Sequence, residues 1–422
     1  MHTDNKKKIA MVVQRYGLEV NGGAELECRL YAERLTPFYD VTILTTCAVD
    51  HYTWADSYKP GEEMINGVRV MRFPVDYERK MEEFAPLHGW MMAGKHSPEE
   101  ETKWLLSQGP VSKKLIKYIT AQKDAYECFV FMTYLYHPTV AGVSIVPGKS
   151  VLIPTAHDEP PIYLSIFREV FKKPKAIFYN TLSEQIFVNT MFDNASIRSE
   201  IGGAGVDLPE NIDASTFRQR FGINGPYIVY VGRIEEGKGC QDLFKLLDFY
   251  NKGRLKNRLP PLTLVMVGKA AMKIPERPYV KPLGFVSEND KYAAIMESSF
   301  LVLPSHFESL SIVVLEAFRL GKPVLVNGTC EVLRDHCRIS NGGFYYQTPD
   351  EFCAFTDYLL ENTEVAAQMG RNGQRYQKEY YTWEHIIQKL SSLIEYASNK
   401  EDQKPNAKKA STLNNLDTGK KV

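Results

Sequence analysis

The chain of 422 residues is 44% hydrophobic, which is enough apolar material for two ordinary α/β domains. Lysine plus arginine equals aspartate plus glutamate at 51 each, so the net charge argues against nucleic acid as a partner. The seven cysteines include no Cys-x-x-Cys pair, which argues against a zinc site and a disulfide scaffold and favours a reducing cytosol.

Short runs rich in Val, Ile, Leu, Phe and Tyr alternate with longer helical patterns along the whole chain. The runs are continuously apolar, which is typical of parallel strands covered by helices on both faces. The first series of predicted strands comprises 9–14, 41–46, 68–73, 129–133, 151–155 and 176–180, and the second comprises 227–231, 262–267, 280–283, 300–303 and 324–326. Two such α/β series predict two Rossmann-like, doubly wound domains that face one central cleft.

A Gly-rich segment, 201–207, separates the two series and marks the predicted domain boundary. We predict a first domain over 1–203, a second over 204–381, and a helix over 382–398 that packs back on the first domain. The stretch 399–422 is rich in Lys, Asp and Asn, and we expect it to be a disordered tail.

No apolar run reaches the ~20 residues that a membrane-spanning helix needs, and 9–13 is too short for the core of a signal peptide. We therefore expect a cytoplasmic protein. The lysines of the amphipathic segment 113–123 could give peripheral contact with the inner face of a membrane. An ordinary surface helix with solvated lysines is the interpretation that we favour.

Two junctions between a strand and a helix carry residues suited to phosphate. Gly22 and Gly23 precede a predicted helix, where backbone N–H groups can approach an anion. Arg233 and Lys238 follow the predicted strand 227–231, and together they could neutralise a diphosphate. A plain glycine turn and two solvated charges are the alternatives, and neither segment decides between them alone.

His157 follows the predicted strand 151–155, at the edge where such sheets bind ligands. The pattern leaves open whether it is a structural or a catalytic histidine. Asp158 and Glu159 are its sequence neighbours, and three adjacent side chains of an extended segment cannot all face one ion. No Asp-x-Asp pair occurs in the sequence, so we expect neither a metal nor another cofactor.

Glu308 and Glu316 lie eight residues apart, between a predicted strand and the helix end at 321–323. We predict Glu308 at the turn between strand and helix and Glu316 about two turns into the helix. Eight residues correspond to ~800° of rotation and ~12 Å of rise. Both carboxylates are therefore predicted to point to a similar side and to contact two portions of one elongated ligand.

In this order the segments resemble the retaining glycosyltransferases of family 4, which have the GT-B fold, from Ile9 to about Ala397. The motifs are Gly22–Glu25, Asn66–Val70, Val231–Gly239, Gly284–Ser287 and Glu308–Glu316. The family often has Glu-Gly-Phe-Gly where this chain has Glu308–Ser311, and Pro-Glu in the loop that is here 327–332. These departures concern the identity of the sugar more than the fold or the reaction.

The resemblance implies roles for the motif residues. Glu308 would hold hydroxyls of the donor sugar, and Glu316 would bind the ribose hydroxyls. Arg233 and Lys238 would bind the diphosphate. His157 would contact the sugar, and Gly22 and Gly23 would contact the β-phosphate or the acceptor. The backbone of Phe285 and Val286 would hold the nucleobase. The amides of Leu310, Ser311 and Ile312 would bind the sugar and the diphosphate.

The implied activity is the retaining, metal-independent transfer of a sugar from a nucleotide-diphosphate sugar, with UDP as the expected nucleotide. The first domain would bind a glycan or lipid-linked glycan acceptor, in bacterial surface polysaccharide synthesis, and the second domain would bind the donor. A non-catalytic nucleotide-sugar-binding subunit and a nucleotide-sugar epimerase are the alternatives. The presence of Arg233, Lys238, Glu308 and Glu316 together favours the transferase.

Overall fold

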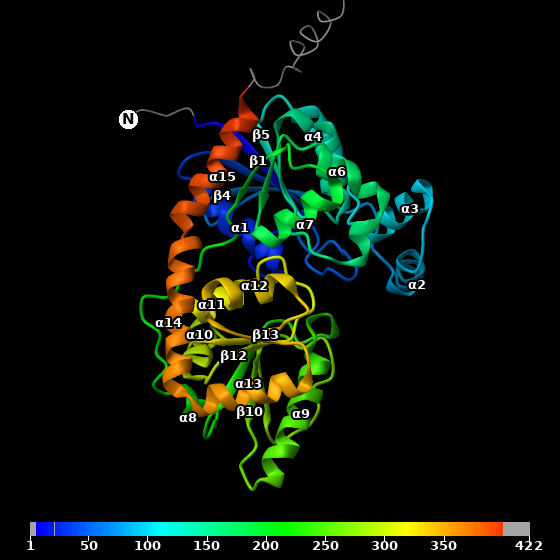
Figure 1. Ribbon diagram of the computed structural model, residues 1–422. Coiled ribbons are helices and arrows are strands. Elements are labelled where there is room, and N and C mark those ends of the chain that lie inside the picture. The colour runs from blue at the N-terminus through cyan, green and yellow to red at the C-terminus, as the bar shows by residue number, and fades with distance from the viewer. Residues whose placement is uncertain (1–5, 21, 400–422) are drawn as a thin grey trace, which may run out of the picture.

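The computed structural model describes residues 6–20 and 22–399 and contains two α/β domains, one above the other in Figure 1. The sheet of the first domain has the strand order β3-β4-β2-β1-β5-β6-β7-β8, and that of the second has the order β11-β10-β9-β12-β13-β14. Neighbouring strands are parallel except for β3 and β4. The predicted pair of Rossmann-like domains is confirmed.

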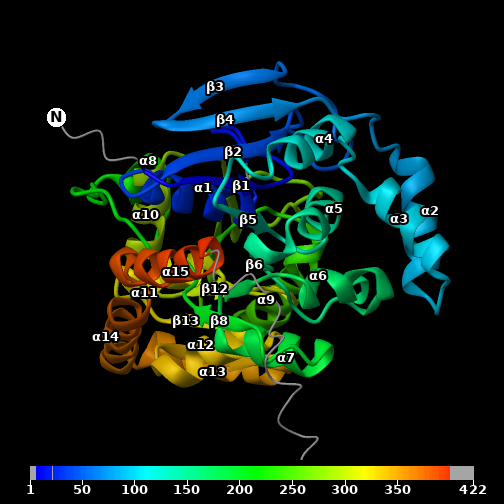
Figure 2. The same cartoon turned by 90° about the horizontal axis from the view of Figure 1, so that it is seen from above.

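The first domain carries eight strands among those described and is covered by helices on both faces. Its strands are β1 (Lys8–Val12), β2 (Asp40–Thr46), β3 (Gly61–Ile65), β4 (Val68–Phe73), β5 (Cys128–Met132), β6 (Ser150–Ile153), β7 (Ala176–Tyr179) and β8 (Arg198–Ile201). Its α-helices are α1 (Gly23–Leu35), α2 (Met81–Met92), α3 (Pro98–Gln108), α4 (Lys113–Gln122), α5 (His137–Ile145), α6 (Arg168–Lys172) and α7 (Leu182–Phe192). Short 3-10 turns are η1 (Pro147–Lys149), η2 (Pro160–Tyr163) and η3 (Ser165–Phe167). Figure 2 shows α2 and α3 standing out to one side of this domain.

The second domain has the same plan with a smaller sheet. Its strands are β9 (Tyr227–Val231), β10 (Thr263–Val267), β11 (Val280–Gly284), β12 (Leu301–Leu303), β13 (Val324–Asn327) and β14 (Gly343–Tyr346). Its helices are α8 (Phe217–Arg220), η4 (Glu236–Lys238), α9 (Cys240–Lys256), α10 (Glu288–Glu297), α11 (Ile312–Arg319), α12 (Glu331–Ser340), α13 (Pro349–Glu361) and α14 (Thr363–Tyr380).

Three strands were not predicted from the sequence, and all three lie at the edge of a sheet: β3 and β8 in the first sheet and β14 in the second. Edge strands have one side and much of their surface in solvent, so they lack the continuous apolar run by which the central strands are recognised. A local signal for β3 does exist. Asn66 and Gly67 have φ angles of 48° and 79°, the conformation of a two-residue hairpin turn, for which Asn-Gly is the preferred sequence.

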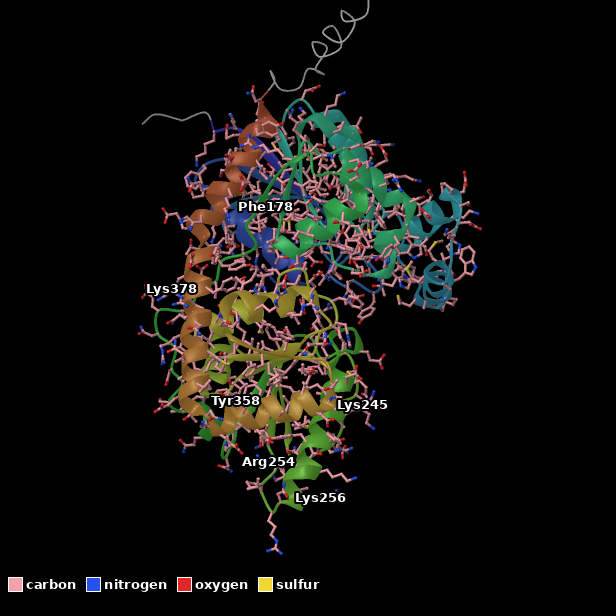
Figure 3. All side chains as sticks on the ribbon, in the orientation of Figure 1. Phe178, Lys245, Arg254, Lys256, Tyr358 and Lys378 are labelled. Carbon is pink, nitrogen blue, oxygen red and sulfur yellow. The ribbon has the colours of Figure 1, made fainter. Side chains whose placement is uncertain are left out.

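The helix α15 (Trp383–Ser398) returns from the second domain to the first, where it contacts α1 and the strands β5 to β8 (Figure 1). Its apolar face is buried in the same core as Phe178 of β7, labelled in Figure 3. The chain crosses between the sheets after Ile201 and before Tyr227, and the limits at 203 and 381 stay predictions. The predicted tail, 399–422, lies outside the described residues except for Asn399.

Candidate active site

The site residues predicted from the sequence follow the carboxyl ends of strands in both sheets. They are Gly22 and Gly23 between β1 and α1, His157 after β6, Arg233 and Lys238 after β9, Phe285 and Val286 after β11, and Glu308, Leu310, Ser311, Ile312 and Glu316 after β12. Two contacts show that the two carboxyl edges face each other. The ring of His157 lies 5.7 Å from that of Phe307, and Arg233 Nη1 lies 3.2 Å from His51 Nε2.

Lys238 and Glu308 form a direct ion pair, with Lys238 Nζ 2.8 Å from Glu308 Oε1. Lys238 ends the short turn η4, and Gly239 follows it with a φ angle of 71°. A Cβ atom at Gly239 would lie 2.3 Å from the carbonyl oxygen of Pro304. Glycine is therefore needed for this turn to approach the loop that carries Glu308, and the close approach brings the two charges together.

Arg233 is held by one residue from each domain. Its Nη2 lies 3.1 Å from Glu235 Oε1, and its Nη1 faces His51 in the loop after β2. Burial, together with the guanidinium groups of Arg233 and Arg15, lowers the pKa of His51 to about 4. His51 is thus neutral at pH 7 and its Nε2 can accept a hydrogen bond from Arg233. Sequence reasoning missed His51, whose only signal is its place beyond the carboxyl end of a strand.

Gly22 has a structural role that the phosphate interpretation did not require. It precedes α1, and a Cβ atom there would lie 1.8 Å from Glu25 Oε2. Glu25 in turn forms a buried ion pair with Arg15, at 2.6 Å. An added side chain at Gly23, by contrast, would meet nothing within 4 Å. Gly22 therefore makes room for the buried carboxylate, and the predicted contact of either glycine with a phosphate or acceptor stays a prediction.

Glu316 lies in α11 and has partners of its own. Its Oε1 accepts hydrogen bonds from Lys291 Nζ at 2.7 Å and from Tyr292 OH at 3.3 Å. Glu308 lies in the turn between strand and helix, as predicted, but α11 begins only at Ile312, so the rotation estimate, which treats all eight residues as helical, is wrong. Each carboxylate instead pairs with its own cation, Glu308 with Lys238 and Glu316 with Lys291. Phe285, at the end of β11, has a side chain that is 77% exposed.

The turn from Leu310 to Ile312 starts α11 in a strained conformation. Ser311 has a φ angle of 64°, and its buried hydroxyl has no hydrogen-bond partner in the part of the chain that the structure describes. The Leu310 carbonyl accepts from His336 Nε2 at 2.7 Å. Burial lowers the pKa of His336 to about 4, so this histidine is neutral, and its hydrogen bond to the Leu310 carbonyl fixes the turn. The family that the sequence resembles often has glycine here, a residue that adopts such angles at little cost.

Glu184 holds the loop that carries His157 in place through hydrogen bonds to the backbone. This carboxyl accepts from the backbone N–H of Ala156 at 2.5 Å and of Asn180 at 2.6 Å, so it joins the carboxyl ends of β6 and β7. Burial raises the pKa of Glu184 to about 8. His157 Nε2 lies 3.3 Å from Glu159 Oε2, so two of the three adjacent polar side chains do share one face.

Glu27 is a second buried carboxyl in this region, and its neighbours indicate that it is protonated. Tyr31 OH lies 2.7 Å from Glu27 Oε1 and 2.6 Å from the Gly203 carbonyl oxygen. One phenol proton cannot satisfy two acceptors, whereas a protonated Glu27 can donate to Tyr31, which then donates to Gly203. Burial raises the pKa of Glu27 to about 7, in agreement with this arrangement. The cluster ties α1 to the segment between the domains.

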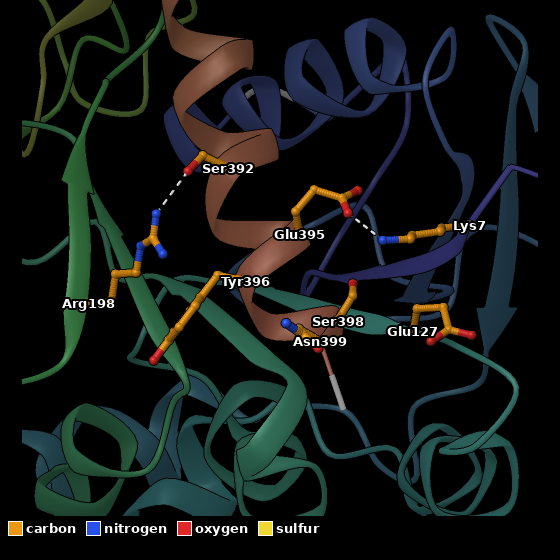
Figure 4. A pocket seen from close by; sticks show the side chains of 8 residues that line it. All are labelled: Lys7, Glu127, Arg198, Ser392, Glu395, Tyr396, Ser398 and Asn399. Carbon is orange, nitrogen blue, oxygen red and sulfur yellow. Dashed lines mark hydrogen bonds and ion pairs between the residues drawn. The ribbon is translucent and has the colours of Figure 1, made fainter. Parts of the chain in front are cut away.

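A hollow of about 690 Å³ lies at the opposite end of the first sheet, as Figure 4 shows. It is lined at the amino ends of the strands by Lys7, Glu127 and Arg198 and along α15 by Ser392, Glu395, Tyr396, Ser398 and Asn399. It therefore does not belong to the candidate site. The described residues contain no group of three or more His, Cys, Asp or Glu placed to hold a metal ion. None of their helices is long and apolar enough to span a membrane.

Comparisons with known proteins agree with this geometry. Residues 213–376 match the family model "Glycosyl transferases group 1". An uncharacterized glycosyltransferase of Methanocaldococcus jannaschii is 22% identical over 427 residues, which cover 92% of this chain and 98% of that protein. Sucrose-phosphate synthase from Thermosynechococcus elongatus is similar in structure, with a TM-score of 0.66 and 15% identity over 92% of this chain and 98% of its own. HepE from Anabaena, in complex with UDP-glucose, has a TM-score of 0.65 and 16% identity over 92% and 99%. The chain thus carries a glycosyl transferases group 1 domain, and its GT-B fold is confirmed.

Replacing Glu27 by Gln should make folding less dependent on pH. The pKa of Glu27 is raised from 4.5 to about 7 in the folded protein. Its protonation therefore stabilises the native state fully below about pH 4.5, and this stabilisation is lost as the pH rises through 7. Glutamine mimics the neutral acid, so the loss of unfolding free energy between pH 5 and 8 should shrink by up to about 3 kcal/mol. Urea unfolding across this range measures the effect. An unchanged pH slope, equal to that of the exposed control Glu361→Gln, would contradict a protonated Glu27.

Replacing Ser311 by Gly should relieve the turn before α11. A left-handed conformation costs an L-residue roughly 1–2 kcal/mol, so Ser311→Gly should be more stable than Ser311→Ala by about 1 kcal/mol. The alanine variant is the matched control, since it also removes the unpaired hydroxyl but keeps the Cβ atom. Denaturant unfolding of both variants measures the difference. Equal stabilities would show that the backbone at this position is not strained.

Proposed function

We propose that this group 1 glycosyltransferase transfers a sugar with retention of configuration from a nucleotide-diphosphate sugar to a glycan or lipid-linked glycan acceptor, without a metal ion. The observation that carries the proposal is the Lys238–Glu308 pair, which faces His157 across the domain boundary. A cation for the leaving diphosphate and a carboxylate for the sugar hydroxyls stand side by side there. Membership of family 4 is part of the proposal.

The chemistry follows from where charge develops. The bond between C1 of the sugar and the diphosphate oxygen stretches, which leaves positive character on the sugar and additional negative charge on the diphosphate. Arg233 and Lys238 would stabilise that leaving group, a role that fixed cations fill without rearrangement. The acceptor hydroxyl attacks C1 from the same face and passes its proton to the departing phosphate oxygen, so configuration is retained.

Glu308 and Glu316 would then bind opposite ends of the donor. Glu316 Oε1 is occupied by Lys291 and Tyr292, which leaves Oε2 to accept from the ribose hydroxyls. Glu308 would accept from sugar hydroxyls once a phosphate takes over Lys238. UDP is the proposed nucleotide, a choice supported by the UDP-glucose bound to HepE. The first domain, with His51 and His157 at its carboxyl edge, would receive the acceptor, and we place the reaction in bacterial surface polysaccharide synthesis.

Removing either partner of the central ion pair should abolish transfer without unfolding the protein. Lys238→Ala and Glu308→Ala should each lower kcat by about 10²–10³-fold, the usual effect of losing one group aimed at developing charge. Release of UDP from UDP-glucose, in the presence and absence of glycan acceptors, measures this. Lys245→Ala is the matched control, because Lys245 also pairs with a carboxylate, Asp242, but in an exposed position on α9 (Figure 3).

Three outcomes of that assay would overturn the proposal. Full activity in either variant would remove the assigned roles. Donor binding without any hydrolysis or transfer by the wild-type protein would favour a non-catalytic binding subunit. Conversion of the donor to an epimer in the absence of acceptor would favour an epimerase.

Nucleotide binding should stabilise the folded protein and should not need a metal. UDP or UDP-glucose at 100 times its dissociation constant should raise the unfolding free energy by ~2.7 kcal/mol. The shift should persist in EDTA and should shrink in Glu316→Ala, which loses the proposed ribose contact. Thermal unfolding with UDP, GDP and ADP in parallel measures the effect and the base preference. A shift that disappears with EDTA would contradict metal-independent binding.

A further inference from the structure

We propose that Glu159 is a positioning residue that orients the ring of His157, holds the proton on Nε2 and so presents Nδ1 to a hydroxyl group of the substrate. The inference deepens the proposed function, on which it rests, because it names the atom of His157 that meets the sugar and the residue that selects this atom.

The geometry singles out Glu159 rather than its neighbour Asp158. Residues 157 to 159 form a tight turn, in which the Glu159 N–H donates to the His157 carbonyl oxygen at 2.8 Å, and this turn brings the two side chains together. Glu159 Oε2 is 3.3 Å from His157 Nε2, and Glu159 Oε1 accepts from Tyr134 OH at 2.6 Å. Asp158 is exposed and accepts instead from Tyr163 OH at 2.7 Å.

Both carboxylate oxygens of Glu159 are already engaged inside the protein. Its side chain is 20% exposed and that of Tyr134 is buried. Glu159 therefore cannot also serve a substrate without giving up a partner. A carboxylate in this position acts through the histidine: it accepts the Nε2 proton, and the other ring nitrogen is left with its lone pair.

The remaining nitrogen, Nδ1, is buried and has no hydrogen-bond partner among residues 6–20 and 22–399. A buried polar atom without a partner costs free energy, so a partner supplied by a ligand would remove that cost. The His157 ring lies at the domain boundary, 5.7 Å from the ring of Phe307, the residue that precedes Glu308. A sugar held by Glu308 would be the nearest source of a hydroxyl.

The charges around His157 fit this arrangement. Burial by itself lowers the pKa of His157, but the carboxylates of Glu159 and Glu308 outweigh burial and the cation of Lys238, so the pKa is raised above its ordinary value of 6.5. His88 and Tyr134 face Glu159 from its other side. Only neutral His157 can accept a hydrogen bond from a hydroxyl group at Nδ1, so transfer should increase as the pH rises through the pKa of His157.

The test combines nuclear magnetic resonance of ¹⁵N-histidine protein with the pH profile of transfer. At high pH the wild-type protein should show His157 as the tautomer with the proton on Nε2, assigned with a His157→Gln variant. In Glu159→Gln the pKa of His157 should fall, and the acid limb of kcat/KM should move to lower pH by the same amount. In Glu159→Ala the tautomer preference should be lost. Asp158→Asn is the matched control and should change none of these.

The outcomes separate this inference from the proposed function. If Nδ1 carries the proton in the wild-type protein, or if Glu159→Gln leaves both the titration of His157 and the acid limb unchanged, Glu159 does not position His157. If the tautomer and its response to Glu159→Gln are as expected but no donor sugar is transferred, Glu159 positions His157 and the proposed function is wrong.

Discussion

The candidate site exists only because the carboxyl edges of two parallel sheets face each other, and this arrangement depends on a narrow crossing of the chain. A Cβ atom at Gly203 would lie within 3 Å of Leu310, Asn180 and Tyr381, and one at Gly205 would lie 2.7 Å from Trp383. Segments from both domains therefore meet around two glycines. Tyr31 donates to the Gly203 carbonyl from α1, and α15 packs across the first sheet. Together these contacts hold the two domains in an orientation in which residues of the first contact residues of the second.

The charges of the candidate site are compensated in pairs. Lys238 pairs with Glu308, Arg233 with Glu235, and Lys291 with Glu316. A diphosphate would compete with the carboxylates for these cations, and each carboxylate that is displaced becomes free to accept hydrogen bonds from sugar hydroxyls. Donor recognition at the phosphate and at the sugar would thus be coupled through one ion pair, since Lys238 cannot bind the phosphate fully while it is held by Glu308.

The buried titratable groups behind the site differ from those that line it. Glu27, Glu184 and His336 have strongly shifted pKa values because they are buried and lack an ionic partner. Glu184 and His336 fix loops through hydrogen bonds to backbone groups, whereas Glu27 bonds to the side chains of Tyr31 and Asn180. His157 is different, because carboxylates from both domains raise its pKa in spite of burial. Nearby carboxylates thus raise the pKa of His157, whereas burial lowers the pKa of His336.

The sequence by itself determined the α/β plan and the central strands, because continuous apolar runs are local features of the chain. It also singled out Arg233, Lys238, Glu308 and Glu316 as candidates, because they follow such runs. Three of the four edge strands, β3, β8 and β14, were missed because solvent on one side removes that apolar run. Only the tertiary structure decided that Lys238 pairs with Glu308, that His51 faces Arg233 from 182 residues away, and that Glu159 rather than Asp158 lies beside His157. These choices depend on distances between segments that no spacing along the chain encodes, because they arise where two separate sheets meet.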